Sequence, residues 1–269
     1  MKVLKFGGGC LKDAKSIQKV PKIISHYDDD IVIVVLSAFG KITNMLEDEK
    51  YEGMLSFIQT IMMDLSFSLN DIEDVLNKKK YFNFSNRLSY PERVSIGEYL
   101  CSEIIHRYLK LENIDNIQLD ATKYIFTDSW NSYLNSAKFH SIHIPNNFLE
   151  SIVKKTIITQ GFIASDINSN SSTTLGREGS DYTAAIFGDA FNADEVILFK
   201  DVDGIYSTDP KKNQDAKLFS HLTYDDAFEL CSDGNTVVHP KTINHLKRKR
   251  IPLLIKNFDN LSKPGTVIS

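Results

Sequence analysis

The stretch that decides the fold reads Thr173-Thr174-Leu175-Gly176-Arg177-Glu178-Gly179-Ser180-Asp181-Tyr182-Thr183-Ala184-Ala185. Apolar residues recur at helical spacing after Ser180, and serine is a favourable N-cap, so we expect a helix to begin there. The free N–H groups and the dipole of a helix start attract anions, and the guanidinium of Arg177 suits a carboxylate or a phosphate. Asp181 places a carboxylate beside that position, where it needs a cation or a chemical role. Alone, the stretch is also compatible with a surface loop that leads into a capped helix.

The start of the chain carries a second candidate site for an anion. Residues 2–6 are apolar apart from their lysines, and they predict a short strand that contains Lys5 and runs into Gly7, Gly8 and Gly9. Glycines let a backbone approach phosphate oxygens closely, and a lysine adds a mobile positive charge. The chain has no GxxxxGK(S/T) pattern, and its glycine run lacks the last glycine of GxGxxG. These two nucleotide motifs are excluded, and a simple tight turn remains the alternative for this loop.

A third polar loop follows the apolar run at residues 31–36. It contains Ser37 and Thr43, at the carboxyl end of what reads as a buried parallel strand. In open α/β sheets, ligands bind at this end of the strands. Capping of the following helix is the alternative role for both hydroxyls.

Apolar runs alternate with amphipathic stretches along the whole chain. This pattern predicts an α/β fold with a mainly parallel sheet covered by helices on both faces. The expected strands are residues 2–6, 31–37, 117–121, 157–163, 196–199 and 253–255. The expected helices begin at about Asp13, restart near Pro21, and cover residues 44–78 and 97–111. The Ser- and Asn-rich residues 165–174 predict a mobile loop, either a lid or a plain surface loop.

Composition limits the class of protein. Hydrophobic residues make up 42% and charged residues 25% of 269 residues, which is typical of a soluble globular protein. The net charge of −4 argues against a protein that coats nucleic acid, and the basic residues 247–250 are expected in the last turn of a helix. The three cysteines fit neither a zinc site nor a disulfide framework. Without a signal peptide or an apolar stretch of membrane-spanning length, the cytoplasm is the expected compartment.

Together these segments resemble the aspartokinases of the amino-acid kinase family. The resemblance covers essentially the whole chain, in order and at compatible spacings. The matching segments are Lys5-Phe6-Gly7-Gly8, Ser37-Ala38 with Thr43-Asn44, Gly97-Glu98, residues 159–163, residues 173–181, residues 201–210 and Val238-His239-Pro240. The resemblance implies the three-layer α/β/α sandwich of that family. It also implies a reaction in which ATP and L-aspartate give ADP and 4-phospho-L-aspartate, the first step toward lysine, threonine and methionine.

The resemblance also assigns roles to individual residues. A carboxylate acceptor needs no general base, so catalysis should consist of positioning and charge neutralisation. Lys5 would stabilise the transferring phosphoryl group, and Asp181 would orient that lysine and the Mg²⁺-phosphate assembly. The residues expected to bind the amino acid are Ser37, Thr43, Glu98, Arg177 and Ser180. The residues expected to bind ATP are Lys5, Gly7, Gly8, Asp201, Gly204, Tyr206 and Lys211. No resident metal site is expected, because Mg²⁺ would be carried by ATP.

Several residues depart from the family pattern. Gly9 and Cys10 replace hydroxyl residues, and Glu178 replaces a glycine beside Arg177. Lys200 stands where threonine is common and Thr236 where some members carry a lysine. These changes leave the nucleotide contacts less well predicted than the acceptor site.

The expected organisation is a single catalytic domain over residues 1–269. Its acceptor-binding half would cover about residues 1–170 and its nucleotide-binding half about residues 171–269. The regulatory ACT domains that follow in typical aspartokinases are not expected, since the sequence stops at Ser269.

Two other functions stay open at this point. One is a related kinase of the same fold with another acceptor, and the other is a non-catalytic nucleotide-binding subunit that regulates a partner. Retention of Lys5, Glu98, Arg177 and Asp181 favours an active enzyme. The expected partners are ATP and L-aspartate, with no nucleic acid and no membrane, and a homodimer is an open alternative.

Overall fold

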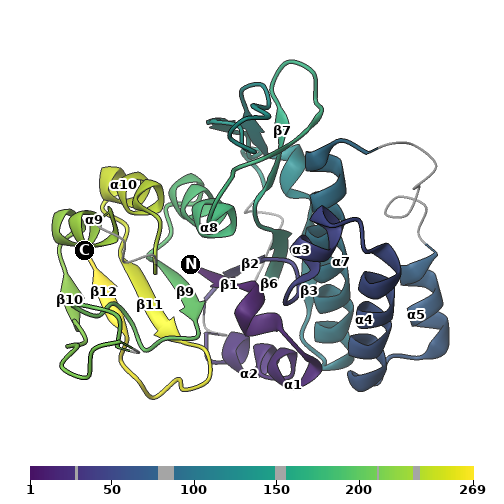
Figure 1. The fold of residues 1–269 in the computed structure, drawn as a ribbon, viewed down its shortest axis with the longest axis horizontal. Coiled ribbons are helices and arrows are strands. Elements are labelled where there is room, and N and C mark those ends of the chain that lie inside the picture. Colours follow the sequence, from purple (N-terminus) through teal and green to yellow (C-terminus); the bar gives the residue numbers. More distant parts are fainter. Residues whose placement is uncertain (28–29, 78–87, 149–155, 211, 233–236) are drawn as a thin grey trace.

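The structure, a computed structural model, describes residues 1–27, 30–77, 88–148, 156–210, 212–232 and 237–269 (Figure 1). Its centre is an eight-stranded sheet in the order β10-β12-β11-β9-β1-β2-β6-β3. The strands are β1 (Lys2–Phe6), β2 (Val32–Leu36), β3 (Asn116–Leu119), β6 (Thr156–Gln160), β9 (Glu195–Lys200), β10 (His221–Leu222), β11 (Leu253–Asn257) and β12 (Thr266–Ile268). All neighbours pair in parallel except β11 and β12. Each predicted strand is present to within a few residues.

Helices cover both faces of this sheet, which confirms the three-layer α/β/α architecture (Figure 1). One face carries α1 (Ala14–Ile17), α2 (Val20–Ser25), α3 (Ile42–Glu47), α4 (Tyr51–Asp64), α5 (Leu69–Leu76) and α7 (Tyr90–Leu111). The other carries α8 (Gly179–Ala190), α9 (Tyr224–Ser232) and α10 (Pro240–Lys249). Side chains alternate along a strand, so Leu4 and Phe6 of β1 pack toward α7 while Val3 packs toward α8. The same alternation assigns Lys5 to the α8 face.

The helical predictions hold with two adjustments, one to the region over residues 44–78 and one to the start of α7. Pro21 lies in the first turn of α2, so the predicted restart is confirmed. The long region over residues 44–78 is three helices, because Glu49 and Ser66 take left-handed backbone angles with φ of 56° and 63°. Helix α7 begins at Tyr90 rather than Gly97, and a capping box formed by Ser89 and Glu92 starts it.

A smaller four-stranded sheet, β5-β4-β7-β8, stands beside the main one. Its strands are β4 (Ile125–Thr127), β5 (Phe139–Ile142), β7 (Ile163–Asp166) and β8 (Ser172–Thr174). The prediction of a loop over residues 165–174 was wrong at both ends, because residues 165–166 and 172–174 belong to the antiparallel hairpin β7–β8, and only residues 167–171 form its turn. Asp166 orders its turn by accepting hydrogen bonds from the N–H groups of Asn168 and Ser169, at 2.8 and 2.9 Å.

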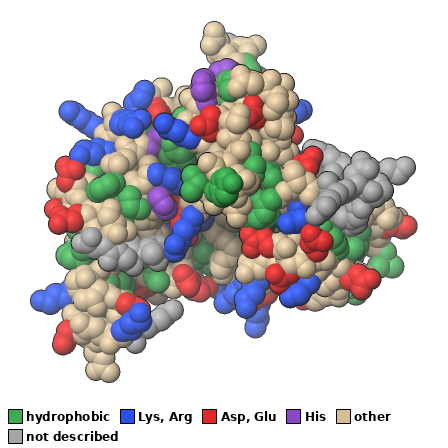
Figure 2. All heavy atoms as spheres, turned by 45° about the horizontal axis from the view of Figure 1, so that its top comes forward, with side chains coloured by type: hydrophobic (Ala, Val, Ile, Leu, Met, Phe, Trp, Pro, Cys, Tyr) green, Lys and Arg blue, Asp and Glu red, His purple; other side chains and the backbone are tan. Residues whose placement is uncertain are grey.

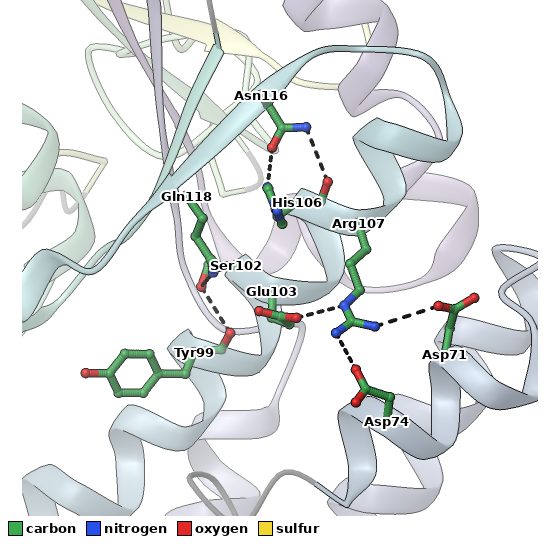
Figure 3. A network of polar contacts seen from close by, with 9 residues as sticks. All are labelled: Asp71, Asp74, Tyr99, Ser102, Glu103, His106, Arg107, Asn116 and Gln118. Atoms are coloured by element: carbon green, nitrogen blue, oxygen red, sulfur yellow. Dashed lines mark hydrogen bonds and ion pairs between the residues drawn. The ribbon is translucent and has the colours of Figure 1, made fainter. Parts of the chain in front are cut away.

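A polar network joins α5, α7 and β3 at one edge of the molecule (Figure 3). The guanidinium of Arg107 on α7 contacts Asp71 and Asp74 on α5 and donates to Glu103 on its own helix at 2.7 Å. Asn116 on β3 lies 2.6 Å from the Nδ1 atom of His106. These contacts fix the edge strand and the outermost helix to α7, which also carries Glu98.

Of the basic residues 247–250, the first three lie in the last turn of α10, as predicted, whereas Arg250 is the C-cap residue that follows the helix. All three cysteines are buried free thiols. Within the described ranges, no helix is both long enough and apolar enough to cross a bilayer.

Gly97 is required by the contact between α7 and α3. A Cβ atom at Gly97 would lie 2.9 Å from Cγ2 of Ile42 and 3.0 Å from Cβ of Ala38, whereas a Cβ at Gly53 on α4 would meet nothing within 4 Å. Alanine gains about 1 kcal/mol of helix propensity at either site, and only Gly97→Ala adds an overpacking cost of about 1–3 kcal/mol. We therefore expect Gly53→Ala to be more stable than Gly97→Ala by that overpacking cost in equilibrium urea unfolding. Equal stabilities would show that the helix contact relaxes freely.

Candidate active site

A cleft of about 590 Å³ opens where the carboxyl ends of β1, β2 and β9 meet the start of α8. The face drawn in Figure 2 is hollowed near its centre, with basic and acidic side chains around the hollow. Nine predicted site residues line this cleft: Lys5, Gly7, Gly8, Ser37, Thr43, Glu98, Arg177, Ser180 and Asp201. Segments that are up to 196 residues apart in the sequence, from Lys5 to Asp201, therefore share one site.

Asp181 lies beneath the cleft as the centre of an ionic cluster. Its side chain is fully buried, and its Oδ1 and Oδ2 atoms lie 2.6 Å from the Nζ atoms of Lys5 and Lys200 respectively. Lys200 also contacts Oε2 of Glu178 at 3.3 Å. Burial alone would raise the pKa of Asp181, but the charges of Lys5 and Lys200 outweigh it and hold the pKa well below its usual range. Asp181 is therefore permanently ionised at neutral pH.

The same two effects, burial and neighbouring charge, act on the pKa of Lys200 with opposite signs. Burial alone would lower its pKa, but the attraction of Asp181 and Glu178 outweighs burial and raises the pKa above its usual value. It is the last residue of β9, on the same face of the sheet as Lys5. The sequence pattern marked Lys200 only as a departure, and its contact with Asp181 was not predicted.

Helix α8 begins differently from the prediction. It starts at Gly179 with Glu178 as its N-cap residue in a left-handed conformation, φ 52° and ψ 31°, so the prediction of Ser180 as the cap was wrong. Ser180 instead packs against Gly161, where an added Cβ would lie 2.5 Å from Cβ of Ser180. This close approach presses the helix start onto the end of β6 and fixes Asp181 above β1.

The glycine loop lies against the loop after β2. Gly8 begins a short 3₁₀ helix (Gly8–Leu11), and an added Cβ would lie 2.9 Å from the carbonyl oxygen of Ala38. The N–H group of Gly40 donates to the carbonyl oxygen of Gly8 at 3.2 Å. A side chain at Gly8 would separate the two loops, so glycine is needed for their packing as well as for phosphate access. The thiol of Cys10 is buried and donates to the carbonyl oxygen of Phe199 at 3.3 Å.

Glu98 is a buried carboxylate that faces the cleft from α7. It is 3% exposed, and its Oε2 atom has no hydrogen-bond partner among the described residues. Burial raises its pKa to about 8, although the N–H group of Ala38 and the charge of Lys5 oppose the shift. A buried carboxyl group that lines a cavity and has one oxygen without a partner is suited to a cationic ligand group.

Two further features support the rim of the cleft. Nζ of Lys241 donates to the carbonyl oxygens of Leu175 and Arg177 at 2.8 Å each, which braces the loop that carries Arg177. On the opposite side, the hydroxyl of Tyr90 donates to Glu47 at 2.7 Å, and its ring stacks on Trp130. None of these supporting contacts was predicted from the sequence.

Two further predicted nucleotide residues, Gly204 and Tyr206, are not among the described residues that line the cleft. Gly204 has a φ of 152° and packs against Thr266, where an added Cβ would lie 2.4 Å from Oγ1. The hydroxyl of Tyr206 donates to Asp203 at 3.4 Å. Lys211 falls outside the described residues. His239 is the N-cap residue of α10, and its side chain accepts a hydrogen bond from the N–H group of Lys241.

Comparison with known proteins gives a consistent result. The model of the Amino acid kinase family matches residues 1–257. A chloroplastic bifunctional aspartokinase/homoserine dehydrogenase of Daucus carota is 30% identical over 98% of this chain and 32% of its own length. Aspartokinase 1, chloroplastic, of Arabidopsis thaliana is 29% identical over 99% of this chain and 52% of its own length. The chain thus spans about a third to a half of these two relatives.

Solved structures agree with this result. The structure of E. coli aspartokinase III in complex with aspartate and ADP superimposes with a TM-score of 0.84 at 27% identity, over 100% of this chain and 64% of that one. The aspartate kinase of Clostridium acetobutylicum gives 0.80 at 28% identity, over 100% of this chain and 63% of that one. This chain belongs to the amino acid kinase family.

Proposed function

We propose that this chain is an aspartokinase, which transfers the γ-phosphoryl group of ATP to the β-carboxylate of L-aspartate. One observation carries the proposal: the same cleft combines an ionised Lys5–Asp181 pair with Glu98 and Arg177. The first pair suits a transferring phosphoryl group, and the second offers a negative and a positive group to a zwitterion. The aspartokinase names of the similar proteins support the same reaction.

The acceptor would be held by groups of matching charge. In the proposal, Glu98 binds the α-ammonium of aspartate and Arg177 binds its α-carboxylate. Ser37, Thr43 and Ser180, which also line the cleft, would donate hydrogen bonds to the amino acid. The β-carboxylate is already ionised at neutral pH and attacks without a general base, so the protein's task is to place it in line with the γ-phosphorus atom.

The phosphoryl group would be neutralised by Lys5, with Gly7 and Gly8 admitting its oxygens to the loop backbone. Asp201 lines the cleft at the end of β9 and would contact the nucleotide, while Gly204, Tyr206 and Lys211 remain predicted contacts. Among the described residues, no group of three or more His, Cys, Asp or Glu side chains could hold a metal ion. Mg²⁺ is proposed to enter with the phosphates of ATP.

The proposed division of labour follows the two ends of the chain. Residues up to about 170 would mainly bind the acceptor, and later residues mainly the nucleotide. The exceptions are Lys5, Gly7 and Gly8, which would contact the phosphates, and Arg177 and Ser180, which would reach the acceptor. A cytoplasmic location and a homodimer remain predictions from the sequence.

Asp181→Ala tests the phosphoryl site. The substitution leaves two lysines without their shared carboxylate, and removal of such a preorganised charge costs about 3–4 kcal/mol of transition-state stabilisation, or roughly 10²–10³ in kcat. Acyl phosphate trapped as the hydroxamate, with ATP, Mg²⁺ and L-aspartate, measures the loss, and L-glutamate serves as a second acceptor. Asp189→Ala on the same helix removes a carboxylate that pairs with Lys249 outside the cleft, and it should stay near wild type.

The same assay separates the alternatives. Product with aspartate that disappears in Asp181→Ala establishes the kinase and its acceptor. Product only with another acceptor would move the substrate assignment. Binding of ATP without any turnover would favour a regulatory subunit instead of an enzyme.

The pKa of Glu98 makes aspartate binding depend on pH. Below about pH 8 the free protein holds Glu98 protonated, so binding of an α-ammonium must expel that proton. The Kd of L-aspartate should therefore rise as pH falls from about 8, by up to about tenfold per pH unit. Calorimetric titration of L-aspartate between about pH 6 and 9 measures it.

Glu98→Gln is the matched control for this pH dependence. It keeps the shape of the side chain, removes the titration, and should bind aspartate about 10–100-fold more weakly at high pH because a charged hydrogen bond is lost. Lys241, whose pKa burial lowers to about 8, titrates in the same range in both proteins. An identical pH profile in wild type and Glu98→Gln would assign the effect elsewhere.

A further inference from the structure

Lys200 and Glu178 form an ion pair that the proposed reaction does not itself require. Nζ of Lys200 lies 2.6 Å from Oδ2 of Asp181 and 3.3 Å from Oε2 of Glu178, so one ammonium bridges two carboxylates. Lys200 is 15% exposed and Glu178 34% exposed, whereas Asp181 is fully buried. Both Lys200 and Glu178 line the cleft beside the glycine loop. The pair therefore connects a buried functional carboxylate to the open cleft.

The backbone at Glu178 carries a conformational cost. Its φ of 52° and ψ of 31° lie in the left-handed region, which costs a residue other than glycine roughly 1–2 kcal/mol. Glycine would adopt this conformation freely, so the glutamate side chain has a compensating contact, and that contact is Lys200.

Charge balance points to the same dependence. Lys5, Lys200, Asp181 and Glu178 carry a formal net charge of zero, beside a loop suited to phosphate oxygens. Without Lys200, two carboxylates would remain near that loop with one lysine, and they would repel a nucleotide. Without Glu178, Lys200 would have a single carboxylate partner and would be free to turn toward the phosphates.

We propose that Lys200 and Glu178 act as one positioning unit: Lys200 holds the Oδ2 side of Asp181 so that Oδ1 faces Lys5, and Glu178 keeps Lys200 on Asp181 and away from the nucleotide phosphates. Lys5 is then placed for the phosphoryl group by a carboxylate fixed from both sides. The catalytic part of this inference rests on the proposed kinase function. The electrostatic part concerns only nucleotide binding and stands without it.

A double-mutant cycle tests the pair through nucleotide binding, which needs no acceptor. The proteins are wild type, Lys200→Met, Glu178→Gln and the double variant, each titrated with ATP and Mg²⁺ by calorimetry. Lys200→Met should weaken ATP binding by about tenfold, and Glu178→Gln should strengthen it by about threefold. If the two positions were independent, the change in ATP affinity of the double variant would be the product of the two single changes. We expect its affinity to exceed that product by at least about threefold, because the two residues no longer act on each other.

Steady-state kinetics tests the positioning of Asp181. Lys200→Met should lower kcat by at least about tenfold while the KM for aspartate stays within about threefold, since only the phosphoryl site is disturbed. Lys200→Arg, which can still reach both carboxylates, should recover most of kcat. A pair with a purely structural role would lower the temperature of thermal unfolding without this split between kcat and KM.

Two results would overturn the inference. One is a set of ATP affinities that shows no coupling between the two positions, either because the two single changes simply multiply or because wild type binds no ATP. The other is a kcat for Lys200→Met within about threefold of wild type. Failure of the kinase function is recognised separately, because wild type itself would then yield no aspartyl hydroxamate, while the ATP titrations would still report on the pair. If Lys200→Met does not fold, Lys200→Gln, which also removes the positive charge, takes its place in both experiments.

Discussion

The contact of Asp181 with Lys5 and Lys200 is the interaction on which the rest of the site depends. A fully buried carboxylate is stable only while it is paired, because a single unpaired charge in the interior costs several kcal/mol. The pairing requires β1, β9 and the start of α8 to meet at one point. Strand order places β9 directly beside β1, and the close contact between Gly161 and Ser180 holds the helix start above them. The fold and the ionic cluster thus support each other.

Two carboxylates in the same cleft are given opposite properties by their surroundings. Asp181 lies against two lysines and has a lowered pKa, whereas burial without an ion-pair partner raises the pKa of Glu98 to about 8. Divergent pKa values of neighbouring acids are typical of sites in which the two have different roles. Asp181 is satisfied by cations of the protein itself. Glu98 lacks a hydrogen-bond partner on Oε2 within the described chain, so it is ready for a cation that a ligand brings.

Much of the architecture could be predicted because apolar runs and glycine loops are local signals. The strands, the restart at Pro21 and the cleft residues from Lys5 to Arg177 follow from such signals or from the family resemblance. The hairpin β7–β8 could not be predicted, because Ser165 and Asp166 are held in a strand by pairing with Phe126 and Thr127 of β4, about 39 residues earlier in the chain. The N-cap of α8 was not predicted because Glu178 takes a left-handed backbone conformation, which is unfavourable for glutamate. The bridge made by Lys200 depends on a contact between β9 and α8, which no local pattern contains.

The parallel pairing of β1 with β9 has a consequence for folding. In the observed register Lys5 is opposite Leu198 and Phe6 is opposite Phe199, whose rings stack with centroids 4.9 Å apart. Side chains alternate between the two faces of a strand. The ammonium groups of Lys5 on β1 and Lys200 on β9 therefore both lie on the α8 side only in this register. A slip by one residue would turn one of them toward α7 and leave Asp181 with a single counter-charge. The charged groups of the cleft therefore favour the observed register of β1 and β9 over a shifted one. The apolar side chains favour it only weakly, because both faces of these strands are buried and an apolar residue fits either face.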